Sequence, residues 1–226
     1  MGTLPDELRV ELSGLCQQRA SLYGLLSRLY SSEIDDVVLA DLKKTAFPAR
    51  TGNELVDMGY RKIATYLSGD TKNAVLELSI DFVNTFFGHG NFLFSAAYPF
   101  ESVYTSEKRL MMQEARDDVL GAYRAADFVI DPNWKEPEDH IAVELLFMKT
   151  MCESTQKALD EGDEDAALEL IGSQRDFFQQ HLAAWAPMMT TDMKRIAKTE
   201  FYQGLAYLTE GFLQVDRGFL ESVISH

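Results

Sequence analysis

The sequence has few of the residues that build disulfide-bonded, metal-binding or membrane proteins. It contains two cysteines and four histidines in 226 residues. Two cysteines are too few for a disulfide framework, and Cys16 and Cys152 lack the paired spacing of a zinc site. Both lie in helical apolar patterns, so we predict buried thiols in a reducing compartment. The N-terminus carries acidic residues, unlike a secretory signal, and no run approaches the ~18 apolar residues of a membrane span. These absences predict a cytoplasmic protein.

Basic residues are also scarce. Lys and Arg number 21 against 36 Asp and Glu, which gives a net charge of −15. General nucleic-acid binding needs cations that neutralise phosphates, so this class is excluded. The acidity either attracts cationic partners or only keeps the protein in solution. The chain has neither a Gly-x-x-x-x-Gly-Lys-Ser/Thr loop nor a Gly-x-Gly-x-x-Gly fingerprint, so nucleotide binding has no support from motifs.

Strand-like alternation is nearly absent, whereas helical patterns cover most of the chain. Leucines in the first thirty residues recur three, four or seven positions apart, which marks one face of a long helix. We predict an all-α bundle of about ten helices. After the first helix, the others are expected at 35–45, 53–67, from a Thr71 cap to about 87, 106–126 with a Ser106 cap, 137–159, 163–185, 192–208, and a last one ending near 223.

The run Trp134-Lys-Glu136-Pro137-Glu-Asp139-His140 is the densest group of ionisable residues outside these patterns. Pro suits the first turn of a helix, and acids there face the positive end of the helix dipole. We therefore predict a helix that begins at Pro137, with Glu136, Asp139 and His140 clustered at its N-terminus. Three interpretations stay open: a metal site with help from His89 or His181, acid–base catalysis by His140 with Asp139, and a helix cap with or without a polar binding patch.

A second run, Tyr98-Pro99-Phe-Glu101-Ser-Val-Tyr104, places aromatic residues beside an acid. An arginine of a peptide can stack on a ring and pair with a carboxylate at once. This run therefore suits an apolar peptide that carries a cation. Alternatively, its aromatic residues only anchor the long irregular segment 88–103 to the bundle.

Taken together, the two runs resemble the TorD/DmsD family of cytoplasmic chaperones for molybdenum-cofactor oxidoreductases. The resemblance rests on Pro99-x-Glu101-Ser-Val-Tyr104 followed, about a helix later, by Glu136-Pro137-x-Asp139-His140. It extends over roughly residues 12 to 215 through Tyr23, Asp81-Phe82 to Phe86-Phe87-Gly88, and Phe177 to Pro187. Phe100 departs from the family pattern, which often has Tyr or Trp there.

The resemblance implies one all-α TorD-like domain over residues 1–226 with a hinge near 88–103. It implies a chaperone, not an enzyme, which binds the twin-arginine leader and/or the catalytic subunit of a molybdoenzyme, assists cofactor insertion and prevents premature export. We expect no metal and no cofactor, because the sequence has no metal-ligand spacing and no phosphate-binding loop. The resemblance alone suggests a guanine nucleotide, and it implies a monomer or a homodimer. The expected leader- or client-binding residues are Tyr98, Pro99, Glu101, Tyr104, Trp134, Glu136, Pro137, Asp139 and His140.

Two alternatives belong to other classes. One is a small metal- or nucleotide-dependent hydrolase that uses Glu136, Asp139 and His140, and the other is a helical adaptor. If the chaperone interpretation holds, replacing Asp139 and His140 by alanine should abolish client binding. Because both are expected in an exposed first turn, the stability cost should be only ~0.3–1 kcal/mol.

Overall fold

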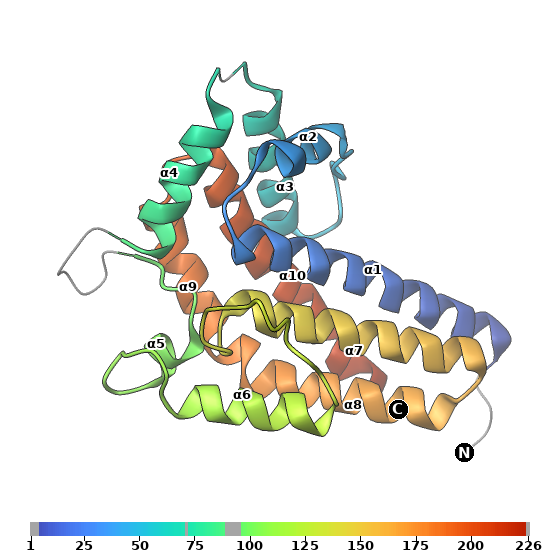
Figure 1. Ribbon diagram of the computed structural model, residues 1–226. Helices are drawn as coiled ribbons and strands as arrows, with labels where there is room; N and C mark the ends of the chain where they lie inside the picture. Colours follow the sequence, from blue (N-terminus) through green and yellow to red (C-terminus); the bar gives the residue numbers. More distant parts are fainter. Residues whose placement is uncertain (1–4, 71, 89–95, 225–226) are drawn as a thin grey trace. The chain divides into compact units, whose positions relative to one another are not determined.

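The computed structural model describes residues 5–70, 72–88 and 96–224 (Figure 1). Within this part of the chain there are ten helices and no strand, apart from one isolated β-bridge between Phe100 and His140. The prediction of an all-α fold is confirmed. The helices are α1 (Asp6–Ser31), α2 (Asp36–Lys44), α3 (Glu54–Ser68), α4 (Ala74–Phe86), α5 (Glu101–Thr105), α6 (Glu114–Ala125), α7 (Ile141–Glu161), α8 (Glu164–Gln180), α9 (Leu182–Ile196) and α10 (Glu200–Ile224).

The chain forms two compact units, and each combines segments that are far apart in the sequence. Unit one contains residues 1–28, 100–184 and 216–226, and unit two contains residues 29–99 and 185–215. The chain crosses from one unit to the other at four points. Three of these points lie inside α1, α9 and α10, and the fourth lies between Pro99 and Phe100. The predicted hinge near 88–103 includes this fourth crossing point. The hinge stays a prediction, since residues 89–95 lie outside the described part of the chain.

Several helix ends follow directly from local sequence. The side chain of Asp35 caps α2 by accepting from Val38 N at 2.8 Å, and Asp163 caps α8 by accepting from Ala166 N at 3.1 Å. Asn53 caps α3 in the same way. Gly162 ends α7 with φ of 78°, a left-handed conformation that glycine adopts without a Cβ clash. These ends agree with the predicted ones.

Because of tertiary contacts, α7 begins later in the chain than the sequence predicts. The helix begins at Ile141 rather than at Pro137, and its N-cap is His140. The residue before the cap is held in the bridge to α5, because the carbonyl oxygen of Asp139 accepts from Glu101 N at 3.0 Å. The prediction that Asp139 occupies the first turn of this helix is therefore wrong.

Other predicted ends were wrong for similar reasons. Ser106 follows α5 instead of capping a helix, because the chain from 106 to 113 forms an irregular loop and Gln113 N donates to Ser102 Oγ at 3.1 Å. The predicted helix 163–185 is divided at His181, which ends α8. α9 then continues through Pro187, and α10 runs unbroken from Glu200. The predicted Thr71 cap lies outside the described residues, and Asn73 precedes α4.

The core of unit one lies around α7 and α8, which run side by side in Figure 1. Tyr123, Phe128, Phe147 and Phe177 form an aromatic cluster between α6, α7 and α8, with ring centroids 4.5–6.0 Å apart. Cys16 and Cys152 are both free and buried, as predicted. Unit one is thus a packed helical body that holds the start of α7 in place.

The core of unit two is built on close contact between α3 and α10. A Cβ on Gly59 would lie 2.5 Å from the backbone nitrogen of Leu208, and one on Gly211 would lie 2.6 Å from the nitrogen of Val56. Only glycine allows this approach. The carboxylate of Asp81, 2% exposed, accepts from the backbone nitrogens of Lys198 and Thr199 and so fixes the start of α10.

Candidate functional site

The two sequence motifs meet in unit one, where α5 begins beside the start of α7. Glu101 N donates to the carbonyl oxygen of Asp139, and Ser102 N donates to Asp139 Oδ2 at 2.8 Å. The Asp139 carboxylate thus caps α5, a role that helix N-termini give to acceptors. The structure therefore brings Glu101, Asp139 and His140 together, and we call these three residues the α5–α7 junction.

Asp139 is fully buried at this junction. Its Oδ1 accepts no hydrogen bond from any residue that the structure describes. Burial of a carboxylate is costly unless hydrogen bonds satisfy it, so its bond to Ser102 N contributes strongly to holding α5 in place.

His140 is 4% exposed and caps α7 with its ring. Its Nδ1 accepts from Ala142 N at 3.0 Å, so this nitrogen carries no proton. The ring makes edge-to-face contacts with those of Phe100 and Trp134, and each of their centroids lies 5.1 Å from its own. Burial lowers the pKa of His140 to about 3, so the imidazole is neutral at physiological pH. It serves the fold as a neutral helix cap.

Glu101 forms a second buried contact, with His181 at the end of α8. Glu101 Oε2 lies 2.9 Å from His181 Nδ1, and the two residues are 3% and 6% exposed. The imidazole also packs on Phe177, with ring centroids 4.7 Å apart. The α5–α7 junction is therefore linked to the α8–α9 turn through this pair.

The remaining predicted residues differ in exposure. Glu136 is exposed, and Trp134, Pro137 and Tyr104 are half-buried, so all four have accessible surface in unit one. Tyr98 and Pro99 belong to unit two, where Tyr98 is half-buried and Pro99 is buried.

Sequence reasoning did not single out the neighbouring Glu138. It pairs with Arg116 of α6, whose hydrogen bonds hold the pKa of the Glu138 carboxyl below its usual value. Tyr123 also donates to the carbonyl oxygen of Glu138 at 3.2 Å. The segment before α7 is thereby tied to α6.

A groove of about 1010 Å³ adjoins the junction and lies wholly in unit one. Sequence reasoning missed it, although the acids between 107 and 118 were a visible signal. It is lined by Glu101, Thr105, Ser106, Glu107, Lys108, Gln113, Glu114, Ala115, Asp117, Asp118, Gly121, Ala122, Ala125, Gln180 and His181.

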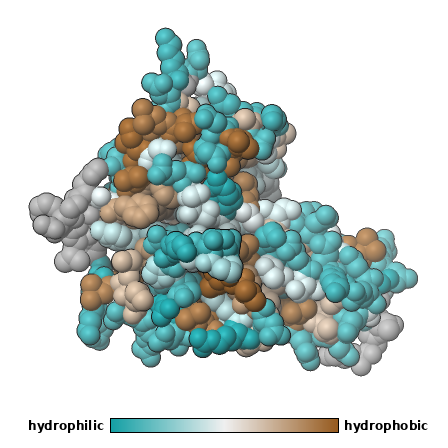
Figure 2. Space-filling model, viewed as in Figure 1, coloured by the Kyte–Doolittle hydropathy of each residue, from teal (hydrophilic) through white to brown (hydrophobic). Residues whose placement is uncertain are grey.

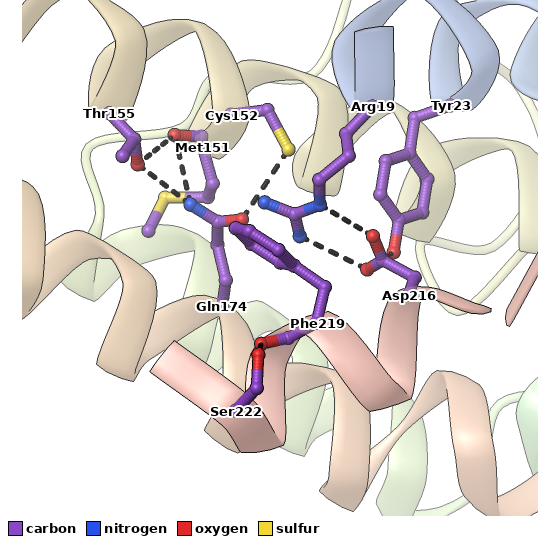
Figure 3. A network of polar contacts seen from close by, with 9 residues as sticks. All are labelled: Arg19, Tyr23, Met151, Cys152, Thr155, Gln174, Asp216, Phe219 and Ser222. Carbon is purple, nitrogen blue, oxygen red and sulfur yellow. Dashed lines mark hydrogen bonds and ion pairs between the residues drawn. The ribbon is translucent and has the colours of Figure 1, made fainter. Parts of the chain in front are cut away.

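A second polar cluster in unit one was also missed. Figure 3 shows Arg19 of α1 facing Asp216 of α10, with Nη2 and Oδ2 3.0 Å apart. Tyr23 Oη donates to the same carboxylate at 2.7 Å. On the other side Cys152 donates to Gln174 at 3.4 Å. All of these side chains are buried, so this cluster fixes α1, α8 and the end of α10 rather than offering a surface to a ligand.

Neither a metal-binding cluster nor a membrane-spanning helix is found among the described residues. They contain no group of three or more His, Cys, Asp or Glu side chains placed to hold a metal ion. His89, a predicted further ligand, lies outside them. None of the described helices combines the length and the apolar character needed to span a bilayer.

Comparison with known proteins decides the family. The family model described as nitrate reductase delta subunit matches residues 53–191, more than half of the chain. The chain belongs to this family. It is also similar to the chaperone protein TorD of Shewanella pealeana, at 26% identity over 96% of each chain. TorD of Vibrio parahaemolyticus and TorD of Aliivibrio salmonicida are each 27% identical to it, over 93% of this chain and 98% of theirs.

These matches confirm the resemblance to TorD. The family and its chaperone relatives confirm the predicted class of function, a maturation chaperone for molybdoenzymes rather than an enzyme. They give the hydrolase alternative no support.

Proposed function

We propose that this protein acts in the cytoplasm, binds the catalytic subunit of a molybdenum-cofactor oxidoreductase together with its twin-arginine leader, and holds that subunit back from export until the cofactor is inserted. The observation that carries the proposal is family membership, with similarity to TorD chaperones over nearly the whole chain. A net charge of −15 supports it, because an acidic protein attracts a leader that carries two arginines.

We further propose that the predicted residues have two different roles. Glu101, Asp139 and His140 are buried and position the start of α5 and α7. Trp134, Glu136, Pro137 and Tyr104 have accessible surface around this junction, which supports a role for them in direct contact with the client. Tyr98 and Pro99 stay predicted contacts in unit two. Whether the chaperone works as a monomer or as a homodimer also stays a prediction.

The experiment is a calorimetric titration of the purified protein with a synthetic twin-arginine leader peptide. We expect saturable binding that weakens as salt rises, because ions screen exposed charges within ~10 Å at 0.1 M ionic strength. A matched peptide with both arginines replaced by glutamine should bind more weakly. Absence of binding to the intact leader at low salt would contradict the proposed leader recognition.

A further inference from the structure

We infer that the groove lined by α5, α6 and the end of α8 binds a basic peptide segment whose positive charges are followed by apolar residues. The inference rests on the proposed function and deepens it. It places the two arginines of the leader in this groove rather than on Asp139 and His140, which are buried.

The charge of the groove is the first argument. Five carboxylates line it, from Glu101, Glu107, Glu114, Asp117 and Asp118, against the single amine of Lys108. Glu107, Glu114, Asp117 and Asp118 are exposed. Arginine presents a planar fork that pairs with carboxylates through two parallel hydrogen bonds. The groove therefore complements guanidinium groups better than it does any neutral or anionic ligand.

Two buried polar side chains also lie at the bottom of the groove, which distinguishes it from an ordinary acidic surface. Glu101 and His181 line it, although each is more than nine-tenths buried. Their mutual bond uses Glu101 Oε2 and His181 Nδ1. The floor of the groove is thus a buried pair of a carboxylate and an imidazole.

An apolar tip lies in the loop between two lining residues, Lys108 and Gln113. Leu110, Met111 and Met112 are consecutive and are 56%, 49% and 61% exposed. Methionine side chains are flexible and adapt to varied apolar partners, and adjacent exposed apolar residues mark interaction surfaces. The tip suits apolar residues that follow directly after the charges of a bound segment.

The test compares two triple variants of the full chain with equal net charge. The groove variant is Glu107→Gln, Glu114→Gln and Asp118→Asn. The control variant is Glu11→Gln, Glu33→Gln and Glu169→Gln, at exposed positions outside the groove. Each removes three negative charges, so the net charge changes from −15 to −12 in both cases (−15 + 3 = −12). Circular dichroism and thermal melting establish that both variants are folded.

The probe is a synthetic peptide with two adjacent arginines followed by an apolar stretch. We expect the groove variant to bind it about tenfold more weakly than the wild type, and the control variant within about twofold. The double variant Leu110→Ser and Met111→Ser should weaken binding of this peptide but not of one that ends after the arginines.

The outcomes separate the inference from the proposed function. If the wild type binds the peptide and the groove variant binds it equally well, the inference is overturned while leader recognition stands. Equal losses in both triple variants would also overturn it, because the effect would then come from net charge alone. If the wild type binds no leader peptide, the proposed leader recognition fails and the inference fails with it.

Discussion

Asp139 and His140, which the sequence predicts to bind the client, are parts of the folded core of unit one. Both are buried, and each caps a helix, Asp139 for α5 and His140 for α7. The expectation that both could be replaced at a cost of ~0.3–1 kcal/mol assumed an exposed first turn. The structure contradicts that assumption. Loss of client binding in such variants would therefore follow from a disturbed α5–α7 junction as well as from lost contacts.

At Asp139 the prediction concerns stability. Asp139→Ala leaves the buried N–H of Ser102 without its acceptor, which should lower the free energy of unfolding by ~1–3 kcal/mol. Asp139→Asn keeps an acceptor oxygen and should cost less. Glu136→Ala, at an exposed position in the same segment, is the control and should change stability by less than ~0.5 kcal/mol. Urea unfolding measures all three, and a midpoint for Asp139→Ala equal to that of the wild type would contradict the capping role.

At His140 the prediction concerns pH. Its folded-state pKa of about 3 lies below the unfolded value of 6.5, so the unfolded chain binds the proton more readily. The stability that the neutral ring contributes to the folded protein is therefore fully present above pH 6.5, and it is lost as the pH falls toward 3. Between these two pKa values, the loss of stability from this group alone approaches about 1.4 kcal/mol for each pH unit.

The matched variant for this pH effect is His140→Asn, because asparagine also caps helices but does not titrate. Between pH 6.5 and 5 its stability should fall less steeply than that of the wild type. The Glu101–His181 pair is present in both proteins, so the comparison isolates the change at His140. Parallel stability curves for the two proteins would show that protonation of His140 does not destabilise the fold.

At the scale of elements, the sequence predicts a helix better than it predicts which residues the helix meets. The starts of α2, α3 and α8 were predicted, at 35, 53 and 163, because each depends on one side chain and the turn beside it. The start of α7 was not predicted, because a hydrogen bond between residues 37 positions apart, Ser102 and Asp139, overrides the local preference of Pro137 for a first turn. Burial of Asp139 and His140 has the same origin. The ring of His140, for example, packs against Phe100 and Trp134, which spacing in the sequence does not show.

The α3–α10 contact in unit two provides an element-scale prediction. Gly59→Ala should destabilise the protein strongly, because the new Cβ would lie 2.5 Å from the backbone of Leu208. Gly172→Ala in α8 meets no atom within 4 Å and should raise stability by roughly 0.5–1 kcal/mol through helix propensity. Thermal melting of both variants checks the pair. A Gly59→Ala protein as stable as the wild type would mean that the two helices are not in close contact.

Unit two also exposes an apolar stripe along α4, where Figure 2 shows hydrophobic side chains at the surface. Leu76, Ile80, Val83 and Phe87 are 58%, 53%, 40% and 54% exposed, at spacings of four, three and four residues. This spacing places them on one helix face. The sequence predicted a helix here, and Leu78, Phe82 and Phe86 form its buried face, but the exposed apolar face was not predicted.

At the scale of the whole molecule, the sequence predicted the fold class and the family correctly, because both depend on local patterns and not on tertiary contacts. Helical periodicity predicted the all-α fold, and two short motifs in order indicated the TorD-like family, which the family model and the chaperone relatives confirm. The sequence did not predict the division into two interleaved units. It arises because segments before residue 29 and after residue 215 pack with the middle of the chain.

The central claim, a maturation chaperone for a molybdenum oxidoreductase, is tested most directly by the molybdenum content of the client. The catalytic subunit is produced with this chain, and without it, in cells that lack other chaperones of the family, and molybdenum per purified subunit is measured by mass spectrometry. The chaperone account predicts a clearly higher molybdenum content in the subunit made with the chain, and a diminished gain when Asp139→Ala replaces the wild type. Equal molybdenum content with and without the chain, for the oxidoreductase encoded beside it, would contradict the account.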